Sequence, residues 1–224
     1  MTWLKICGTT NLADAQLSVA AGADALGFVF APSPRRVDVL QASAICAKLP
    51  SGVERIGVFV NESPRHVGEI AGQLPLSGVQ LHGDELAEQM KDFRKALGGR
   101  MIIKTLQAGD MLNAGQEHLA KYLSASASLD AILLDSGSAS VRGGTGNPFA
   151  WEQVAPLAAT IRDALPLIIA GGLHAENVAQ AMEWLDPWGV DVVSGVEREP
   201  GRKDREKLRS FVAAVRREES PAKL

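Results

Sequence analysis

The sequence has little of several residue types, and each shortage excludes a class of protein. Two cysteines, Cys7 and Cys46, occur among 224 residues, too few for a disulfide scaffold or a cysteine-rich metal site. The formal net charge is −3, which does not favour binding to nucleic acid. Neither a membrane-spanning apolar run nor a signal-peptide pattern is visible. We therefore expect a cytoplasmic protein that has no nucleic-acid or membrane partner and keeps its thiols reduced.

What remains is an ordinary globular composition. Hydrophobic residues make up 46% of the chain and charged residues 22%, values typical of a folded domain. The length suits one large domain or two small ones, and α/β barrels often occupy this length as a single domain. No shift in composition marks a linker. We expect one domain over residues 1–217 and a frayed tail over 218–224.

Short apolar segments alternate with amphipathic segments throughout the chain. Expected strands cover residues 4–6, 25–30, 55–60, 78–82, 101–105, 131–135, 167–170 and 190–193. Expected helices cover residues 11–21, 39–49, a segment from 63, 85–97, a segment within 109–123, about 150–164, 175–185 and 204–217. This alternation predicts parallel strands joined by right-handed crossovers. Eight units favour an α/β fold that closes into a single (β/α)₈ TIM barrel, with an open doubly wound sheet as the alternative.

Reactive residues at strand ends are candidates for chemistry, because barrel enzymes place their sites at the carboxyl ends of the strands. Cys7 ends the first strand. It could be a small buried core residue, or a reactive thiolate whose pKa a nearby cation would need to lower. Cys46 lies within a helix and reads as core. Asp135 ends the sixth strand. It could cap the following loop, or it could act as a general acid with a raised pKa.

Other polar residues pass the same positional test. Arg35 and Arg36 follow the second strand, as a solvated pair or as a fork that grips a carboxylate. Asp191 lies within the eighth strand, where it could pair with Lys5 or Lys104 or face a substrate. His82 ends the fourth strand and reads equally well as structural or catalytic.

Small residues follow the last two strands. The seventh strand runs into Gly171 and Gly172, and the eighth into Ser194 and Gly195. In barrels these two loops commonly bind phosphate through backbone N–H groups, although glycine can simply permit a tight turn. A further glycine run at residues 143–146 suits either a surface connection or a mobile cover. No metal-ligand spacing and no dinucleotide fingerprint is present, so we expect neither a metal nor a cofactor.

Taken in order, these residues resemble the phosphoribosylanthranilate isomerase family, and the resemblance runs from the first strand to the last helix. The matching runs are Lys5–Gly8, Ser33–Arg35, Gly57–Asn61, Gln80–Gly83, Leu133–Asp135, Gly143–Gly146, Ala170–Leu173 with Asn177–Val178, Ser194–Glu197 and Gly201–Asp204.

The resemblance implies an enzyme of tryptophan biosynthesis that catalyses an Amadori rearrangement of a phosphorylated small molecule. By analogy Asp135 would be the general acid and Cys7 the general base, so their environments should shift the two pKa values in opposite directions. Arg35 would hold the anthranilate carboxylate, and Asp191 would orient the substrate near its amine. Amides around Gly172, Ser194 and Gly195 would hold the phosphate. The iminium supplies the electron sink, so neither metal nor cofactor is required.

Three positions depart from the family pattern. Ala150 stands where an aspartate is common, Val193 replaces a frequent serine, and Arg36 stands where an aromatic is frequent. The change at Val193 puts one phosphate-side hydroxyl in doubt, while the backbone amides remain.

Two alternatives to this family remain open. A phosphosugar epimerase would use paired aspartates and metal-binding histidines, of which only His82 is visible, and the related histidine-pathway isomerase would use an aspartate in place of Cys7. A non-catalytic barrel that binds phosphorylated ligands is the second alternative, against which the pair of Cys7 and Asp135 argues. The family contains monomers and dimers, and a monomer is the expectation here.

Overall fold

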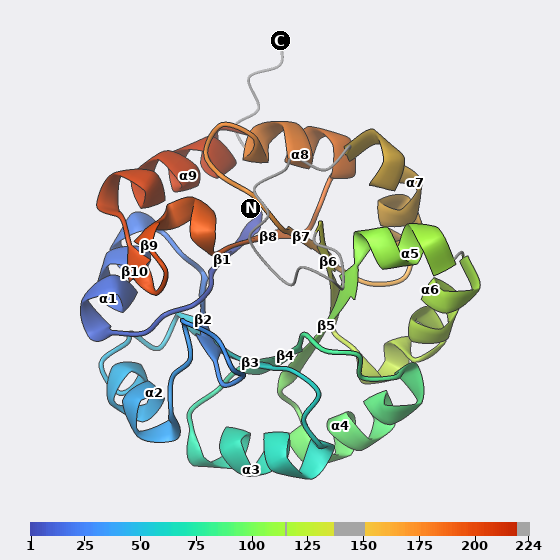
Figure 1. Ribbon diagram of the computed structural model, residues 1–224, viewed down its shortest axis with the longest axis horizontal. Coiled ribbons are helices and arrows are strands. Elements are labelled where there is room, and N and C mark those ends of the chain that lie inside the picture. Colours follow the sequence, from blue (N-terminus) through green and yellow to red (C-terminus); the bar gives the residue numbers. More distant parts are fainter. Residues whose placement is uncertain (115, 137–150, 219–224) are drawn as a thin grey trace.

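The computed structural model describes residues 1–114, 116–136 and 151–218. Eight parallel strands form a closed barrel in chain order, and a ring of helices surrounds them (Figure 1). The strands are β1 (Trp3–Ile6), β2 (Ala25–Val29), β3 (Glu54–Phe59), β4 (Gly78–Leu81), β5 (Met101–Gln107), β6 (Ala131–Asp135), β7 (Leu167–Ala170) and β8 (Gly189–Val192). Because β8 pairs with β1 and closes the sheet, the open-sheet alternative is wrong and the (β/α)₈ barrel is confirmed.

The helices fill the crossovers between strands. They are α1 (Leu12–Ala21), α2 (Val39–Cys46), α3 (Pro64–Gln73), α4 (Met90–Leu97), α5 (Ala108–Ala114), α6 (Gln116–Ser124), α7 (Trp151–Arg162), α8 (Val178–Leu185) and α9 (Arg205–Glu218). Short 3₁₀ turns precede α4, follow α6 and follow β8. The helix expected within residues 109–123 corresponds to α5 and α6, which lie on either side of residue 115, outside the described residues. Helix α4 begins later than residue 85 because a 3₁₀ turn replaces its first part.

Local signals in the sequence explain where α1 and α3 begin and where α1 ends. The Asn11 side chain accepts a hydrogen bond from the Asp14 N–H and caps α1, while Gly22, with a positive φ of 108°, ends it. Ser63 caps α3 in the same way, and Pro64 follows it at the first turn, where a missing N–H costs nothing. Asn11, Gly22 and Ser63 therefore set the ends of these two helices.

One element was not expected from the sequence. After β8, a 3₁₀ turn at Ser194–Val196 leads into β9 (Glu197–Glu199), which pairs antiparallel with β10 (Arg202–Lys203). Gly201, with a φ of 79°, makes the tight turn possible. This hairpin lies beside α1 in Figure 1. Lys203 contacts Cys7 just past the end of β1, so the hairpin brings two charged side chains to the mouth of the barrel.

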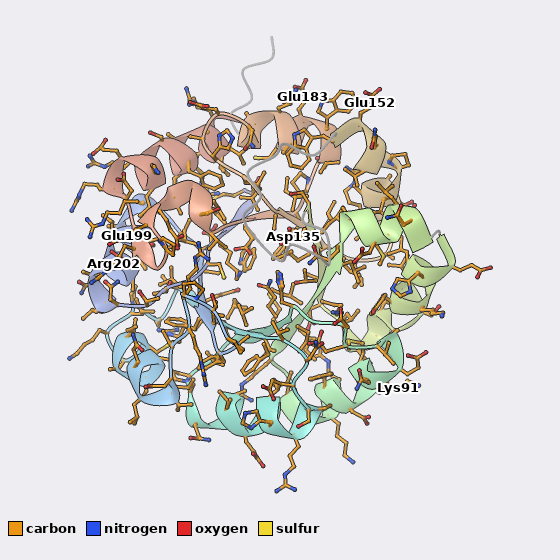
Figure 2. The ribbon with its side chains drawn as sticks, viewed as in Figure 1. Lys91, Asp135, Glu152, Glu183, Glu199 and Arg202 are labelled. Atoms are coloured by element: carbon orange, nitrogen blue, oxygen red, sulfur yellow. The ribbon has the colours of Figure 1, made fainter. Side chains whose placement is uncertain are left out.

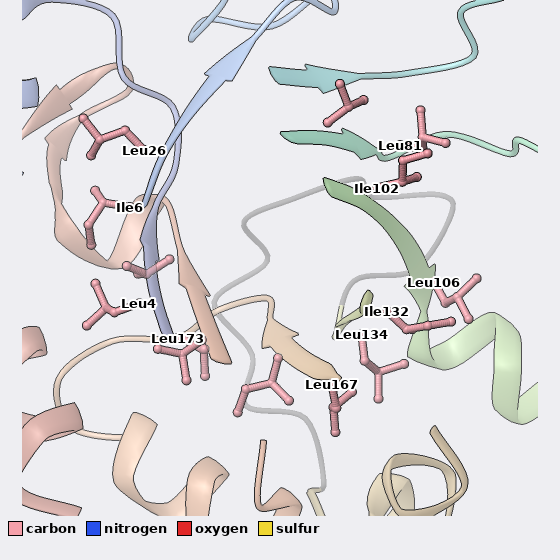
Figure 3. Packing of buried hydrophobic residues seen from close by; sticks show 14 of the residues in the cluster. Leu4, Ile6, Leu26, Leu81, Ile102, Leu106, Ile132, Leu134, Leu167 and Leu173 are labelled. Atoms are coloured by element: carbon pink, nitrogen blue, oxygen red, sulfur yellow. The ribbon is translucent and has the colours of Figure 1, made fainter. Parts of the chain in front are cut away.

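Alternation along each strand separates two cores. One set of side chains points outward and packs under the helices, including Leu4, Ile6, Leu26, Ile132 and Leu134 (Figure 3). The other set fills the barrel itself with residues from six strands: Trp3, Ala25, Ile56, Ile103, Ala131, Leu133, Ile168 and Ala170. The lower part of the barrel is therefore a packed apolar core, and buried polar side chains such as Lys5 and Asp191 lie above it, towards the carboxyl ends of the strands.

Helix α9 includes Glu218, the first residue of the expected tail, and the rest of that tail lies outside the described residues. Cys46 is the last residue of α2 and is buried, as expected for core. Among the described residues, no helix has both the length and the apolar character needed to span a bilayer.

Candidate active site

Cys7 lies one position past the end of β1, on the inward-facing side of the strand. Its parity is that of Trp3, which belongs to the barrel interior. The thiol packs against Gly27 of β2, where an added Cβ would lie 2.5 Å from Sγ. A larger residue at position 27 would therefore push the thiol away from its place. Cys7 is buried and is not in a disulfide.

Two lysines approach Cys7, but burial has the larger effect. Burial raises the pKa of the Cys7 thiol above its ordinary value, and the negative charge of Asp191 adds to this effect. The ammonium groups of Lys5 and Lys203 act in the opposite direction. The expectation that neighbouring cations lower this pKa is therefore not met. The free energy lost by removing the thiolate from water exceeds the stabilisation that the two lysines provide.

An ion pair lies inside the barrel beside Cys7. Lys5 Nζ lies 2.9 Å from Asp191 Oδ1, and both side chains are almost completely buried. Of the alternatives open for Asp191, pairing with Lys5 is what the structure shows. The two atoms meet at ion-pair distance without hydrogen-bond alignment. Lys5 Nζ and Asp191 Oδ1 therefore each keep a hydrogen-bonding position that a substrate inside the barrel mouth could use.

Asp135 ends β6 inside the same mouth. It is 6% exposed, and Figure 2 shows it close to the barrel axis, whereas Glu152 and Glu183 lie on the outer ring. Its Oδ2 atom lies 3.8 Å from Nε2 of His82, which follows β4. An added Cβ at Gly171 would come within 2.6 Å of Asp135 Oδ1, so a glycine is needed there to leave room for the carboxyl group.

His82 is neutral in this site. Burial lowers its pKa to about 4, and the charges of Lys5 and Lys104 contribute, against the opposing effect of Asp191. The Gln80 amide Nε2 lies 2.9 Å from His82 Nδ1. Because an amide nitrogen can only donate, Nδ1 accepts, which leaves the proton on Nε2, facing Asp135. This histidine is a neutral neighbour of the carboxyl group rather than a cationic acid.

A buried ion pair fixes the loop that carries His82. Lys104 Nζ lies 2.8 Å from Glu85 Oε2 and donates to the Gly83 carbonyl at 2.8 Å. The Glu85 carboxylate also accepts hydrogen bonds from two backbone N–H groups, that of Asn61 at Oε1 and that of Gly83 at Oε2. The loops after β3 and β4 are therefore tied to β5, which holds His82 beside Asp135.

The two small-residue loops after β7 and β8 lie against each other. Gly171 and Gly172 both have positive φ angles, a conformation that favours glycine. An added Cβ at Gly195 would come within 1.9 Å of the Leu173 carbonyl oxygen, so the backbones of the two loops are in contact. In the described part of the chain, neither the Gly172 N–H nor the Ser194 N–H donates a hydrogen bond. These donors suit an anionic group such as phosphate.

Arg35 reaches the same mouth from the loop after β2. Its guanidinium makes a two-point contact with Glu197, with Nη2 to Oε2 at 2.7 Å and Nε to Oε1 at 3.0 Å. Arg35 thus grips a carboxylate bidentately, as its predicted role requires, but here the carboxylate belongs to the chain itself. Arg36 is exposed, which fits the reading of a solvated side chain.

Sequence reasoning assigned no role to Glu197 or Lys203, although both lay within the family-like runs. Lys203 Nζ donates to the Cys7 carbonyl at 2.6 Å and lies 3.2 Å from Glu197 Oε1. The sequence feature that could have pointed to Glu197 is a charged residue directly after a run of small and apolar residues, in the loop following the eighth strand.

Within the described residues no group of three His, Cys, Asp or Glu side chains could hold a metal ion. The glycine run at 143–146 and Ala150 lie outside the described residues.

Comparisons with known proteins agree with this picture. Residues 4–214 match the family model described as N-(5'-phosphoribosyl)anthranilate (PRA) isomerase. The N-(5'-phosphoribosyl)anthranilate isomerase of Rubrobacter xylanophilus is 43% identical over 217 residues, covering 96% of this chain and all of the relative. The crystal structure of the Thermotoga maritima phosphoribosyl anthranilate isomerase superposes with a TM-score of 0.82 at 36% identity, covering 96% of this chain and 99% of that one.

A second similar structure contains a ligand. It is a phosphoribosyl anthranilate isomerase in complex with reduced 1-(o-carboxyphenylamino)-1-deoxyribulose 5-phosphate, with a TM-score of 0.79 and 35% identity over 96% of this chain and 99% of that one.

Fold and site together define a (β/α)₈ barrel of the enzyme type, with a thiol and a carboxyl group at the strand ends and two small-residue loops between them. The family match covers nearly the whole chain and adds the chemistry. This chain belongs to the N-(5'-phosphoribosyl)anthranilate isomerase family, whose members are aldose–ketose isomerases of tryptophan biosynthesis. The family and the enzyme class predicted from the sequence are confirmed.

Proposed function

We propose that this chain converts N-(5-phosphoribosyl)anthranilate into 1-(2-carboxyphenylamino)-1-deoxyribulose 5-phosphate by an Amadori rearrangement, with Asp135 as general acid and Cys7 as general base. Asp135 protonates the ribose ring oxygen, which opens the ring and gives an iminium. The Cys7 thiolate then removes the proton from C2. The resulting enolamine tautomerises to the ketose, so no atoms or electrons are gained or lost.

The order of the strands is the observation that carries this assignment. Going round the barrel, β7 and β8 separate β6 from β1, and the loops after β7 and β8 are the two that offer small residues and backbone donors. A phosphosugar held by those loops therefore has the Asp135 carboxyl on one side and the Cys7 thiol on the other. Asp135 can then protonate the ring oxygen while Cys7 takes the C2 proton from the other side of the bound sugar, as this isomerisation requires.

The raised pKa of Cys7 is compatible with its role as a base. A buried thiol exists mostly in its neutral form before substrate binds. The iminium that follows ring opening places a positive charge beside the thiol, and such a charge favours the thiolate. A thiolate generated in a buried site is also a strong base, because its own proton affinity is high. The thiol gives its proton to water before the transfer step, and the iminium charge stabilises the resulting thiolate until it takes the C2 proton.

The remaining contacts assign the binding groups. Amides around Gly172, Ser194 and Gly195, with the glycine turn at Gly171, hold the phosphate. Asp191, held by Lys5 at 2.9 Å, orients the substrate near its amine. Arg35, which is 22% exposed at its side chain, binds the anthranilate carboxylate.

The reaction and its two proton-transfer groups are tested together. Purified chain supplied with phosphoribosylanthranilate, without added metal or cofactor, is expected to yield the ketose product. Cys7→Ala and Asp135→Asn should each lower kcat by about 10²–10⁴-fold with the far-UV circular dichroism spectrum unchanged. Cys46→Ala is the matched control, a buried cysteine in α2 that should keep full turnover. Near-normal turnover of a folded Cys7→Ala protein would remove the thiol from the mechanism.

Assembly and location complete the proposal. We take the chain to be a monomer, although a Thermotoga maritima relative at 35% identity is described as dimeric; light scattering on the purified protein decides between the two. A cytoplasmic location follows from the need for Cys7 as a free thiol, since an oxidising compartment would consume it.

A further inference from the structure

Three charges meet beside Cys7 in a cluster of which the proposed mechanism uses only Arg35. Glu197, the first residue of β9, is the centre of this cluster, and its side chain is 3% exposed. Arg35 contacts it from the loop after β2, and Lys203 contacts it from β10 at 3.2 Å. Burying ions costs free energy even when they are paired. We therefore expect a carboxylate that is buried between two cations to serve the function of the site as well as its stability.

The contact with Glu197 uses one edge of the Arg35 guanidinium. Glu197 accepts hydrogen bonds from Nε and Nη2. A guanidinium carries five N–H groups in a planar fork, so a second edge, formed by Nη1 and the outer N–H of Nη2, is left over. Among the described residues, nothing accepts a hydrogen bond from Nη1 of Arg35. This second edge has the geometry that binds a planar carboxylate with two parallel hydrogen bonds.

The stem of Arg35 is held over the end of β1. An added Cβ at Gly8 would lie 2.7 Å from Arg35 Cδ, so the glycine next to Cys7 makes room for the arginine side chain. The guanidinium is close enough to Cys7 for the two to interact electrostatically. A carboxylate on the second edge would therefore lie beside the base.

Glu197 is fixed independently of Arg35. The Gly201 N–H donates to its Oε1 atom, and Lys203 Nζ lies beside the same oxygen while donating to the Cys7 carbonyl at 2.6 Å. Burial alone would raise the pKa of Glu197, yet the Arg35 hydrogen bond and the Lys203 charge hold it below its ordinary value. The carboxylate is thus charged and immobile before any ligand arrives.

We propose that Glu197 is a positioning residue that holds Arg35 by its Nε–Nη2 edge and thereby presents the opposite edge to the carboxylate of the substrate. The inference rests on the proposed role of Arg35. It adds that Arg35 binds the substrate carboxylate only while Glu197 holds its Nε–Nη2 edge. A lysine, which carries a single point charge, cannot bind two carboxylates through two such edges.

A double-mutant cycle tests the inference through KM and kcat. Arg35→Ala is expected to raise KM about 10- to 100-fold, the range for losing a charge-assisted hydrogen-bonded pair. Glu197→Gln should raise KM about tenfold, with a smaller effect on kcat. In the Arg35→Ala background Glu197→Gln should change KM by less than about twofold, since its effect passes through Arg35. Inhibition by a product analogue with phenyl in place of carboxyphenyl should be unchanged in both single variants.

The outcomes separate the two proposals. An unchanged KM in Arg35→Ala would remove the carboxylate role of Arg35 and the inference with it. A raised KM in Arg35→Ala, combined with an unchanged or lower KM in Glu197→Gln, would overturn the inference alone. So would an equal effect of Glu197→Gln in both backgrounds. Asp24→Asn is the control, because it weakens an Arg216–carboxylate pair at the opposite end of the barrel and should leave KM unchanged.

Arg35→Lys keeps the test decisive if Glu197→Gln does not fold. A lysine can still pair with Glu197, but it has no second edge to offer. We expect a thermal midpoint near that of the wild type and a KM close to that of Arg35→Ala. A wild-type KM in Arg35→Lys would overturn the two-edge arrangement.

Discussion

His82 should make the free energy of unfolding depend on pH between about 6.5 and 4. In the folded chain burial lowers its pKa to about 4, whereas the unfolded chain restores the ordinary value of 6.5. Between these two values the unfolded state binds more protons than the folded state. The contribution of His82 is therefore fully present above pH 6.5 and is lost as the pH falls towards 4.

The magnitude follows from the two pKa values. A difference of about 2.5 corresponds to about 3 kcal/mol at 1.36 kcal/mol per pKa unit. The side chain is 20% exposed, so screening by water reduces the expected loss to about 2 kcal/mol. That is a large fraction of the stability of an ordinary domain, and it is measurable by urea unfolding.

The assay compares the wild type with His82→Gln in urea at several pH values from 4 to 8. Other groups titrate in both proteins, so the difference between the two curves isolates His82. The wild type is expected to lose about 2 kcal/mol more than the variant between pH 7 and pH 4. Parallel curves would refute the reasoning, as would an NMR titration that places the pKa of His82 near 6.5. Either result would mean that water reaches the ring and that it can be protonated beside Asp135.

Three further predictions concern the residues around this site. Gly27→Ala should lower kcat at least about tenfold, because its Cβ would lie 2.5 Å from the Cys7 thiol, and should cost about 1–3 kcal/mol; Gly72→Ala in α3, whose Cβ meets no other atom, is the control, and equal kcat in the two variants would contradict the close contact. Lys104→Met should destabilise the chain by about 3–5 kcal/mol in urea, since it strands the buried carboxylate of Glu85, and Glu85→Gln added to it should restore part of this loss; no restoration would show that the pair is not the cause. The raised pKa of Cys7 predicts that kcat/KM of the free enzyme rises with pH beyond the range of an ordinary thiol, and a plateau reached below pH 8 would show that the thiolate already forms without substrate.

Much of the site could be predicted because strand parity and strand order are local properties. Cys7 and Asp135 each follow a short apolar run, and a residue at the carboxyl end of a barrel strand faces the mouth when its parity matches the interior set. The loops with Gly171 and Ser194 follow from their place after the seventh and eighth strands in the same way. Counting the strands was enough to put these residues at one end of one barrel.

Element boundaries were less predictable where local signals are weak. Helix α2 ends at Cys46, three residues before the expected end at Leu49. Likewise α4 begins only after a 3₁₀ turn. The hairpin of β9 and β10 carries no alternating apolar pattern; it is held by the contacts of Glu197 and Lys203 with residues more than 150 positions away.

The sequence alone determined the eightfold alternation, the closed barrel and the family, because each depends on patterns within short segments or on their order. Only the tertiary structure decided which charges pair: Lys5 with Asp191, Lys104 with Glu85, and Arg35 with Glu197. It also decided that the pKa of Cys7 rises rather than falls. Pairing and proton affinity depend on distance and on exclusion of water, which sum over atoms from many segments and exist only once the chain has folded.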